Sequence, residues 1–570
     1  MFKRILKHQS SQGRVSESKA YSILGSWRFV SGLLIFLLVY LWYASNRGIQ
    51  IYDEGVLLTG AETVLRGGIP YRDFWNTYGP GQYYILAGLF KLFGTTMLTA
   101  RAYTVVSEWA VTILSYFIGR RLTGLLGGLV SCITVCVWLN YDRFVLYPMV
   151  PALVFVLAGY LILTCHPTNP RLSAAAGLLL GCAVLVRHDL GVYAFAGQSA
   201  IIFGDGLFIG HLRRENYSSR LVSTIKRFLA LSIGAAAVVL PVAFALFRTV
   251  PRQFLYEAFI DFPRRIYPQF RSVPVATEFV RFVSSGGIRE RVYQFIDAVV
   301  PLLILLLPVF VFCMTWIFVV MGWKKKERPL REPWLAAGLA LFGLGLYYSV
   351  RVRPDHFHMV AAVAISLILF PWLSGAIRAQ VSTRWVSLSL RLILLFCVAI
   401  LSVKGLKEKK RAFQDHDWIP IAGIDRARGI LVPKEEGTSG LTDAIKYVQL
   451  KTAPGEFIFV GNRRHDLIFM NSALFYFLSD RISATRYIDM LPGVVTTAKV
   501  QSEIINDLKR HDVEYVVLCT MPMPSEPNKS SVSSGVTILD DFVRTNYKPE
   551  AEFGRYSILH RSGDSLGSGS

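Results

Sequence analysis

Long apolar segments alternate with short polar ones from residue 27 to residue 403. A helix that spans a bilayer needs about 20 mostly apolar residues. This pattern predicts an α-helical polytopic membrane protein. We expect eleven transmembrane helices, at 27–45, 101–119, 122–139, 147–165, 172–186, 190–208, 228–247, 297–321, 334–350, 357–374 and 388–403.

A further apolar stretch, Pro80 to Phe93, is short for a span and contains Lys91. If it spans, most basic loops lie on the outer side, against the positive-inside rule. If it does not, those loops share the side of the N-terminus. We therefore predict a re-entrant or interfacial helix. The basic sites are Arg120, Arg121, Arg171, the segment 213–227, Lys324, Lys325, Lys326, Arg328, Arg331, Arg378 and Arg384.

This topology divides the chain into four parts. They are a cytoplasmic N-terminus at 1–26, a membrane domain at 27–403 with outer loops at 46–100 and 248–296, a soluble extracytoplasmic domain at 404–561, and a disordered Gly/Ser-rich tail at 562–570. One observation disagrees, because the basic run from Lys404 to Arg411 falls on the outer side.

The soluble domain has a different pattern from the membrane domain. We expect amphipathic helices at 441–450 and 500–509, and strands at 456–460 and 513–518. Strands that alternate with helices are typical of a small α/β domain.

Composition agrees with a membrane location, with 53% hydrophobic and only 18% charged residues. The net charge of +22 is explained by the orientation of loops, and no basic motif indicates a nucleic-acid partner. None of the seven cysteines has the spacing of a disulfide framework or a metal site. We predict no cofactor.

Asp53 and Glu54 follow the first expected span on its outer side. Ordinary hydrated loop acids would also be found there. A carboxylate at the boundary between water and lipid is also suited to general-base chemistry on an acceptor hydroxyl. The same loop holds a segment rich in aromatic and turn residues, with the pair Arg72–Asp73 and Tyr78. It is either a tight surface loop or a platform for a sugar or prenyl group.

Three more polar clusters fall at outer ends of spans. Each could be a capping ion pair, but together with the Asp53 loop they favour a polar cavity that opens outward. Their ligand spacing does not predict a metal site. The clusters are Asp142 with Arg143; Arg187, His188 and Asp189; and Arg351, Arg353, Asp355, His356 and His358.

The outer loop 248–296 contains eight arginines and no lysine, with aromatic residues between them. The planar guanidinium group binds phosphate oxygens in pairs. Anchoring to lipid headgroups is the competing explanation. The leading candidates for a prenyl-phosphate clamp are Arg264, Arg265 and Arg271.

The order of these features resembles the GT-C membrane glycosyltransferases. A basic N-terminus precedes one span and Asp53-Glu54, and Gly-Gly-Ile-Pro-Tyr and Tyr-Gly-Pro-Gly follow before an interfacial helix. The closest branch is glycosyltransferase family 39, the relatives of protein O-mannosyltransferases, which includes the lipid A aminoarabinose transferase. By this resemblance Asp53 matches the essential first-loop aspartate, Glu54 matches its acidic neighbour, and Asp142 matches a second acid more loosely.

The resemblance implies transfer of a sugar from a polyprenyl-phosphate donor to an extracytoplasmic glycan, lipid or protein, with inversion, by an enzyme of the plasma (inner) membrane. A prenyl phosphate is a good leaving group, so one base and cationic stabilisation suffice. We predict catalytic roles for Asp53, Glu54 and Asp142, donor-phosphate binding by Arg264, Arg265, Arg271, Arg187 and Arg353, and substrate binding by Arg72, Asp73, Tyr78, His188, Asp189, Asp355 and His356.

Two other classes remain open from the sequence. A transporter or flippase of lipid-linked sugars would place its polar residues near the middle of the membrane, on broken helices in repeated halves. No internal repeat is visible in this chain. In a membrane-anchored sensor, the soluble tail would be the active part, and the outer acids and arginines would have no purpose.

Overall fold

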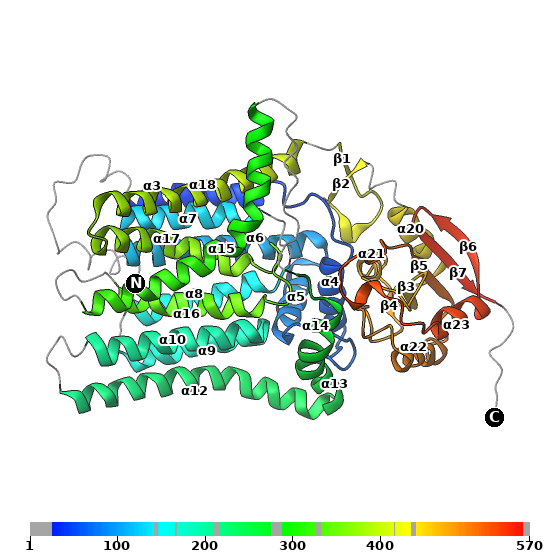
Figure 1. Ribbon diagram of the computed structural model, residues 1–570. Helices are drawn as coiled ribbons and strands as arrows, with labels where there is room; N and C mark the ends of the chain where they lie inside the picture. The colour runs from blue at the N-terminus through cyan, green and yellow to red at the C-terminus, as the bar shows by residue number, and fades with distance from the viewer. Residues whose placement is uncertain are drawn as a thin grey trace.

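A helical bundle forms one end of the molecule and a small α/β domain forms the other (Figure 1). The structure is a computed structural model that describes residues 26–141, 146–165, 168–209, 216–274, 288–324, 332–414, 417–434 and 440–562. The N-terminal residues and the expected disordered tail from residue 563 lie outside these ranges.

Each expected span coincides with one helix of the described chain, which confirms the α-helical class. These helices are α3 (Trp27–Trp42), α6 (Met97–Thr123), α7 (Leu125–Leu139), α8 (Met149–Cys165), α9 (Pro170–Val186), α10 (His188–Phe203), α12 (Tyr217–Thr249), α15 (Ile288–Lys324), α16 (Pro333–Ser349), α17 (Val360–Gln380) and α18 (Arg384–Gln414). By length and composition, α12, α15, α17 and α18 are long enough to cross a membrane. The number of spans stays a prediction.

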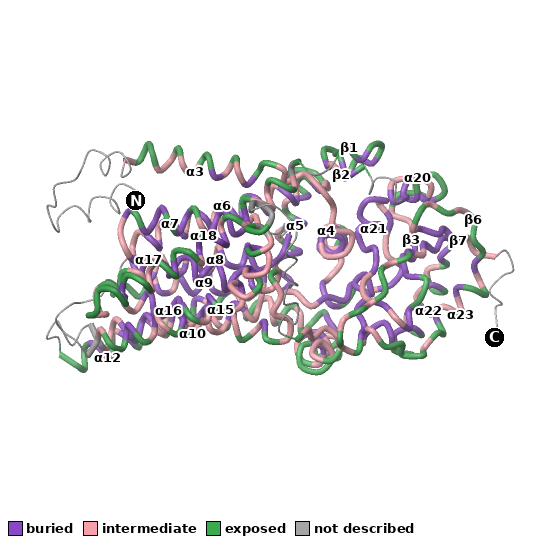
Figure 2. Tube along the Cα trace, turned by 45° about the horizontal axis from the view of Figure 1, so that its top comes forward, coloured by how far each residue is buried: buried purple, intermediate pink, exposed green. Residues whose placement is uncertain are grey.

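Burial divides the bundle into core and periphery. Almost every residue of α17 is buried, whereas α12 exposes most of its apolar surface. Figure 2 shows buried residues concentrated between the helices, with α3 exposed over much of its length. A helix that is apolar on every side is stable only inside protein or lipid. The exposed apolar surfaces of α3 and α12 therefore need a cover of lipid or of another protein surface.

The helix starts follow from local sequence. Ser26 accepts a hydrogen bond from the backbone N–H of Phe29 at the start of α3, and Thr96 caps α6 in the same way. Asn169 caps α9, and a proline occupies the first helical position.

Between α3 and α6, two short helices lie at the junction of the bundle and the α/β domain (Figure 1). They are α4 (Asp53–Leu65) and α5 (Pro80–Phe93). The 14 residues of α5 extend over about 21 Å, which is less than the roughly 30 Å of a hydrocarbon core. The structure therefore has a short helix where the sequence predicts a segment that does not span.

The last bundle helix, α18, continues to Gln414, past the boundary expected at residue 403. The positive charges of its basic run, Lys404 to Arg411, are partly neutralised. Lys404 and Lys407 bind the Asp297 carboxylate of α15 at 2.7 Å and 3.1 Å, and Lys409 donates to the Asn140 side chain at 2.7 Å. These contacts tie part of the basic run to α15 and to the end of α7.

The α/β domain contains a five-stranded sheet in the order β4-β3-β5-β7-β6. The expected strands and helices are confirmed as β3 (Phe457–Asn462), β5 (Tyr515–Cys519), α20 (Leu441–Lys451) and α22 (Ala498–Arg510). The structure adds β4 (Ile482–Ser483), β6 (Tyr547–Phe553), β7 (Tyr556–Arg561), α21 (Leu474–Ser479) and α23 (Ile538–Asn546). Strand β3 is parallel to β4 and β5, whereas β7 is antiparallel to β5 and β6.

The helical bundle and the α/β domain are joined along α4. The backbone N–H of Leu474 donates to the carbonyl of Ile51 at 3.0 Å, and Thr59 Oγ1 donates to the Ala473 carbonyl at 3.0 Å. Between these bonds, a Cβ on Gly55 would lie 2.2 Å from the nitrogen of Leu474. The two backbones therefore meet directly, and only glycine fits.

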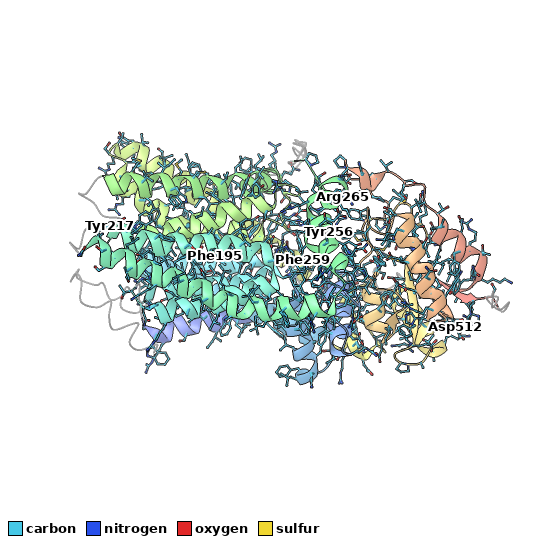
Figure 3. The ribbon with its side chains drawn as sticks, turned by 90° about the horizontal axis from the view of Figure 1, so that it is seen from below. Phe195, Tyr217, Tyr256, Phe259, Arg265 and Asp512 are labelled. Carbon is cyan, nitrogen blue, oxygen red and sulfur yellow. The ribbon has the colours of Figure 1, made fainter. Side chains whose placement is uncertain are left out.

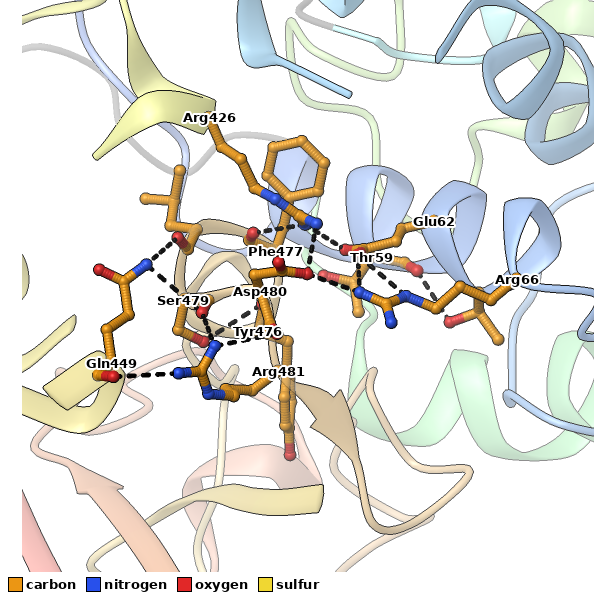
Figure 4. Close-up of polar contacts among 12 residues, drawn as sticks. Thr59, Glu62, Arg66, Arg426, Gln449, Tyr476, Phe477, Ser479, Asp480 and Arg481 are labelled. Carbon is orange, nitrogen blue, oxygen red and sulfur yellow. Dashed lines mark hydrogen bonds and ion pairs between the residues drawn. The ribbon is translucent and has the colours of Figure 1, made fainter. Parts of the chain in front are cut away.

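Four charged side chains extend this contact at the other end of α4 (Figure 4). Arg66 binds both Glu62 and Asp480 at 2.6 Å. Arg426 also binds both acids, at 2.6 Å and 2.5 Å. Because each arginine contacts both acids, this ion cluster joins α4 to two segments of the C-terminal region.

We predict that Gly55→Ala lowers the stability of the folded protein by about 1–3 kcal/mol, the usual cost of overpacking. The added methyl group cannot fit against the Leu474 backbone. The measurement is the thermal unfolding midpoint of the detergent-purified protein. Gly32→Ala on exposed α3, where nothing lies within 4 Å, is the matched control and should not be destabilising. Equal midpoints for both variants would contradict the prediction.

Candidate active site

Asp53 is the first residue of α4 and lies at the junction of the two parts. Its carboxylate makes no hydrogen bond with any described residue. Burial raises the pKa of this carboxyl group, while the nearby charges of Arg271, His358 and Arg353 pull the pKa down. Asp53 is therefore an unpaired acid surrounded by cationic groups from two distant segments.

A network of ion pairs fixes the segment between α16 and α17. Arg353 binds Asp355 at 2.9 Å and Glu526 of the α/β domain at 2.6 Å. Asp355 also lies 2.6 Å from Nδ1 of His358, whose Nε2 is 3.3 Å from the Tyr267 hydroxyl. Burial alone raises the pKa of Asp355, but the hydrogen bond and charge of His358 and the charge of Arg353 hold it below its ordinary value.

Arg271 is different from Arg353 because it has no carboxylate partner within the described ranges. Its guanidinium lies 4.4 Å from the centre of the Phe469 ring and donates a long hydrogen bond, 3.5 Å, to the Phe469 carbonyl. Arg271 remains available to an anion, and its charge acts on Asp53.

Arg187 approaches the same region from the α9–α10 connection. It binds Asp189 at 3.0 Å and lies 5.2 Å from the centre of the Tyr147 ring. Burial raises the pKa of the Tyr78 hydroxyl; Asp53 raises it further and Arg187 lowers it. Tyr78 therefore shares one neighbourhood with Asp53 and Arg187.

Asp489 is a buried acid of this site that the sequence analysis missed. Its Oδ1 accepts a 2.6 Å hydrogen bond from the hydroxyl of Tyr52, the residue before Asp53. Burial raises the pKa of Asp489 to about 7; the hydrogen bond from Tyr52 opposes this, and the charge of Asp53 adds to it. The one signal in the sequence is an acid between Ile488 and Met490.

The loop that carries Asp489 is held from both sides. The Asn471 side chain donates to the Ile488 carbonyl at 3.1 Å and accepts from the N–H of Met490 at 3.2 Å. The carbonyl of Arg486 accepts from the N–H of Trp75 at 2.7 Å. A fixed loop keeps the buried carboxyl group against Tyr52.

The arginine-rich outer segment is helical and positions Arg271. It forms α13 (Arg252–Tyr256), the π-helix η2 (Glu257–Ile266) and α14 (Tyr267–Phe270). The Phe259 ring packs on Tyr71 at 5.1 Å, and Phe262 packs on Trp75 at 5.1 Å. The aromatic side of this segment thus rests on the loop between α4 and α5.

The structure does not bring every expected residue to Asp53. Glu54 forms a buried ion pair with Arg101 at 2.6 Å, which fixes α4 on α6. Arg264 and Arg265 are exposed, and Arg265 binds Asp261 at 2.8 Å (Figure 3). Asp142 lies outside the described residues.

The other expected substrate residues occupy separate places. Arg72 and Asp73 form a partly exposed pair at 2.8 Å. His188 packs on Phe259 with ring centres 5.4 Å apart, and His356 packs on the Tyr141 ring. Within the described ranges, no group of three metal-ligating side chains is found.

We predict that Asp489→Asn makes the stability of the protein less dependent on pH. The raised pKa means that the folded chain keeps a proton that the unfolded chain releases above its ordinary pKa. The free energy of unfolding therefore falls as the pH rises from about 4 to about 7, by up to about 1.4 kcal/mol per pH unit. Asparagine removes this contribution.

The measurement is the thermal unfolding midpoint at pH 5 and pH 7. The decrease between these pH values should be smaller for Asp489→Asn than for the unsubstituted protein. Asp541→Asn, an exposed acid of α23, should behave like the unsubstituted protein. The same decrease in all three proteins would rule out an abnormal Asp489.

No protein-family model and no curated protein matches the chain. ArnT from Cupriavidus metallidurans in the apo state has a similar structure, with a TM-score of 0.50 at 12% identity over 93% of this chain and 97% of that chain.

Two further solved structures are similar at lower scores. ArnT from the same organism bound to undecaprenyl phosphate gives a TM-score of 0.48 at 13% identity, over 94% of this chain and 99% of that chain. The oligosaccharyltransferase of Archaeoglobus fulgidus in the apo form gives 0.47 at 12% identity, over 87% and 70%. The likeness to apo ArnT extends over both the bundle and the α/β domain. The chain therefore has the fold of the GT-C membrane glycosyltransferases, as the sequence predicts.

Proposed function

We propose that the protein transfers a sugar from a polyprenyl-phosphate donor to an acceptor on the extracytoplasmic side of the plasma membrane. The observation that carries this proposal is the free carboxylate of Asp53 beside the unpaired guanidinium of Arg271. One is suited to accept a proton, and the other to bind the leaving phosphate.

The proposed reaction is a single displacement with inversion. Asp53 takes the proton of the acceptor hydroxyl while that oxygen bonds to the anomeric carbon. The bond from this carbon to the phosphate oxygen breaks, and the prenyl phosphate leaves with the electron pair. Arg271 stabilises the charge that develops on that oxygen. No cofactor has a step in this scheme.

The neighbouring groups would hold the substrates. Arg187 is a second candidate for the donor phosphate, and Tyr78, Asp189 and Asp355 line the same neighbourhood. Arg353 is already bound by two acids, so we assign it to positioning Asp355 and His358. The proposed acceptor is a hydroxyl group of a glycan, a lipid or a protein.

The proposed orientation rests on charge. Basic residues at the ends of α6 and α17 and at the starts of α9 and α18 lie at the bundle end away from the α/β domain (Figure 1). The positive-inside rule places that end in the cytoplasm. The α/β domain and Asp53 are then extracytoplasmic.

We predict that Asp53→Asn reduces sugar transfer by at least about 100-fold, the usual contribution of a general base. The measurement is transfer of label in membranes that contain the variant, supplied with a panel of radiolabelled polyprenyl-phosphate sugars. Asp541→Asn, an exposed acid of α23 far from Asp53 in the sequence, is the control and should retain activity. If Asp53→Asn folds normally and transfers sugar at the unsubstituted rate, Asp53 is not the base.

We predict that Arg271→Lys raises the KM for the donor by about tenfold, because lysine keeps the charge but loses the paired N–H donors. Arg265→Lys is the matched control, since Arg265 is exposed and paired with Asp261. Donor titrations of both variants provide the measurement. An equal KM in the two variants would remove Arg271 from the phosphate site.

A further inference from the structure

A second polar site lies at the other end of the bundle. The turn between α17 and α18 and the end of α15 surround a cavity of about 770 Å³. Its lining includes Gly322, Arg378, Gln380, Ser382, Arg384 and Arg391. Cavities of this size accommodate small ligands. The α17–α18 turn and the α/β domain are at opposite ends of the molecule (Figure 1).

Three arginines bring positive charge to this cavity, and no acid is among the described residues that line it. Within the described part of the chain, Arg378, Arg384 and Arg391 form no ion pair. The sequence explains this, because residues 356–407 contain no aspartate or glutamate. Like charges that face one cavity repel each other, so an anion that enters it is bound favourably.

The polar groups beside the arginines define the anion further. The Gln380 side chain donates to the Phe318 carbonyl at 3.1 Å, which fixes its orientation, and its buried Oε1 has no partner among described residues. Ser387 Oγ is satisfied by the Ile377 carbonyl at 3.4 Å. The cavity thus offers guanidinium donors for phosphate oxygens beside a glutamine side chain that is held in place.

The surroundings indicate that the anion belongs to a lipid. Leu388 lines the cavity and is exposed, and Trp385 and Leu392 on the same helix are 77% and 54% exposed. Tryptophan is enriched at membrane interfaces, and basic pockets between membrane helices bind lipid headgroups. A headgroup in the cavity would place its acyl chains along this apolar surface.

We propose that this cavity binds the phosphate-bearing headgroup of an anionic membrane lipid. The site is separate from Asp53 and does not depend on the proposed transfer reaction. Three arginines line this cavity beside a fixed glutamine, and guanidinium groups bind phosphate oxygens in pairs.

The test compares binding of phosphatidylglycerol and phosphatidylcholine to the detergent-purified protein by native mass spectrometry. The unsubstituted protein should retain phosphatidylglycerol in preference. The double variant Arg384→Gln/Arg391→Gln should bind it at least about tenfold more weakly, because two of three phosphate donors are lost. The matched control Arg171→Gln/Lys226→Gln removes two exposed charges from other helices near the same end and should bind as the unsubstituted protein does.

Three results would overturn the proposal. The first is equal retention of the two lipids by the unsubstituted protein, and the second is equally weakened phosphatidylglycerol binding in the control variant. The third is full displacement of phosphatidylglycerol by an equal concentration of inorganic phosphate, which would make the ligand a soluble phosphate. Thermal unfolding midpoints show whether each variant folds. If the double variant does not fold, phosphatidylglycerol binding by Arg391→Gln is compared with binding by Arg171→Gln, with the same criteria. Arg391→Lys should bind phosphatidylglycerol more weakly than the unsubstituted protein and more tightly than Arg391→Gln.

Discussion

The direct contact between the backbones of α4 and α21 determines where the reactive groups lie. Gly55 leaves no space for a side chain against Leu474, so the two backbones have one allowed separation. Asp53 is two residues away on the same helix, and Tyr52 reaches Asp489 across the contact. The ion cluster of Figure 4 prevents α4 from sliding or rotating at its other end. The membrane part and the α/β domain thus share one rigid element, and the candidate base stands at its start.

Of the two arginines near Asp53, one is paired with acids and the other is not, and this difference affects the pKa of Asp53 during the proposed reaction. Arg353 is neutralised by Asp355 and Glu526, whereas Arg271 has no acid of its own among the described residues. Without substrate, the charge of Arg271 lowers the pKa of Asp53. A phosphate bound to Arg271 would offset that charge, and the pKa of Asp53 would rise. Asp53 would therefore be a stronger base when the donor is in place than when the site is empty.

Properties that depend on neighbouring residues were predictable from the sequence, and properties that depend on rotation about a helix axis were not. The spans follow from apolar length, which is local. Asp53 and Glu54 are adjacent, yet successive helical residues point about 100° apart, so one faces the site and the other binds Arg101. The sequence does not show which of the two acids faces the site. Arg265 lies near the end of the π-helix η2, whereas Arg271 directly follows α14, and the sequence does not show this change of helix type. Asp489 meets Tyr52 across 437 positions.

At the end of α18, the number of basic residues overstates the charge that they present, because several lysines are paired. Lys404 and Lys407 share the Asp297 carboxylate, and Lys404 also binds Glu408. A paired lysine contributes little field at the membrane surface, because its partner cancels the charge within a few ångströms. At the opposite end, the arginines of the α17–α18 turn have no acid nearby in the sequence. Pairing thus reduces the charge that the lysines at the end of α18 present, whereas Arg378, Arg384 and Arg391 form no ion pair with a described residue.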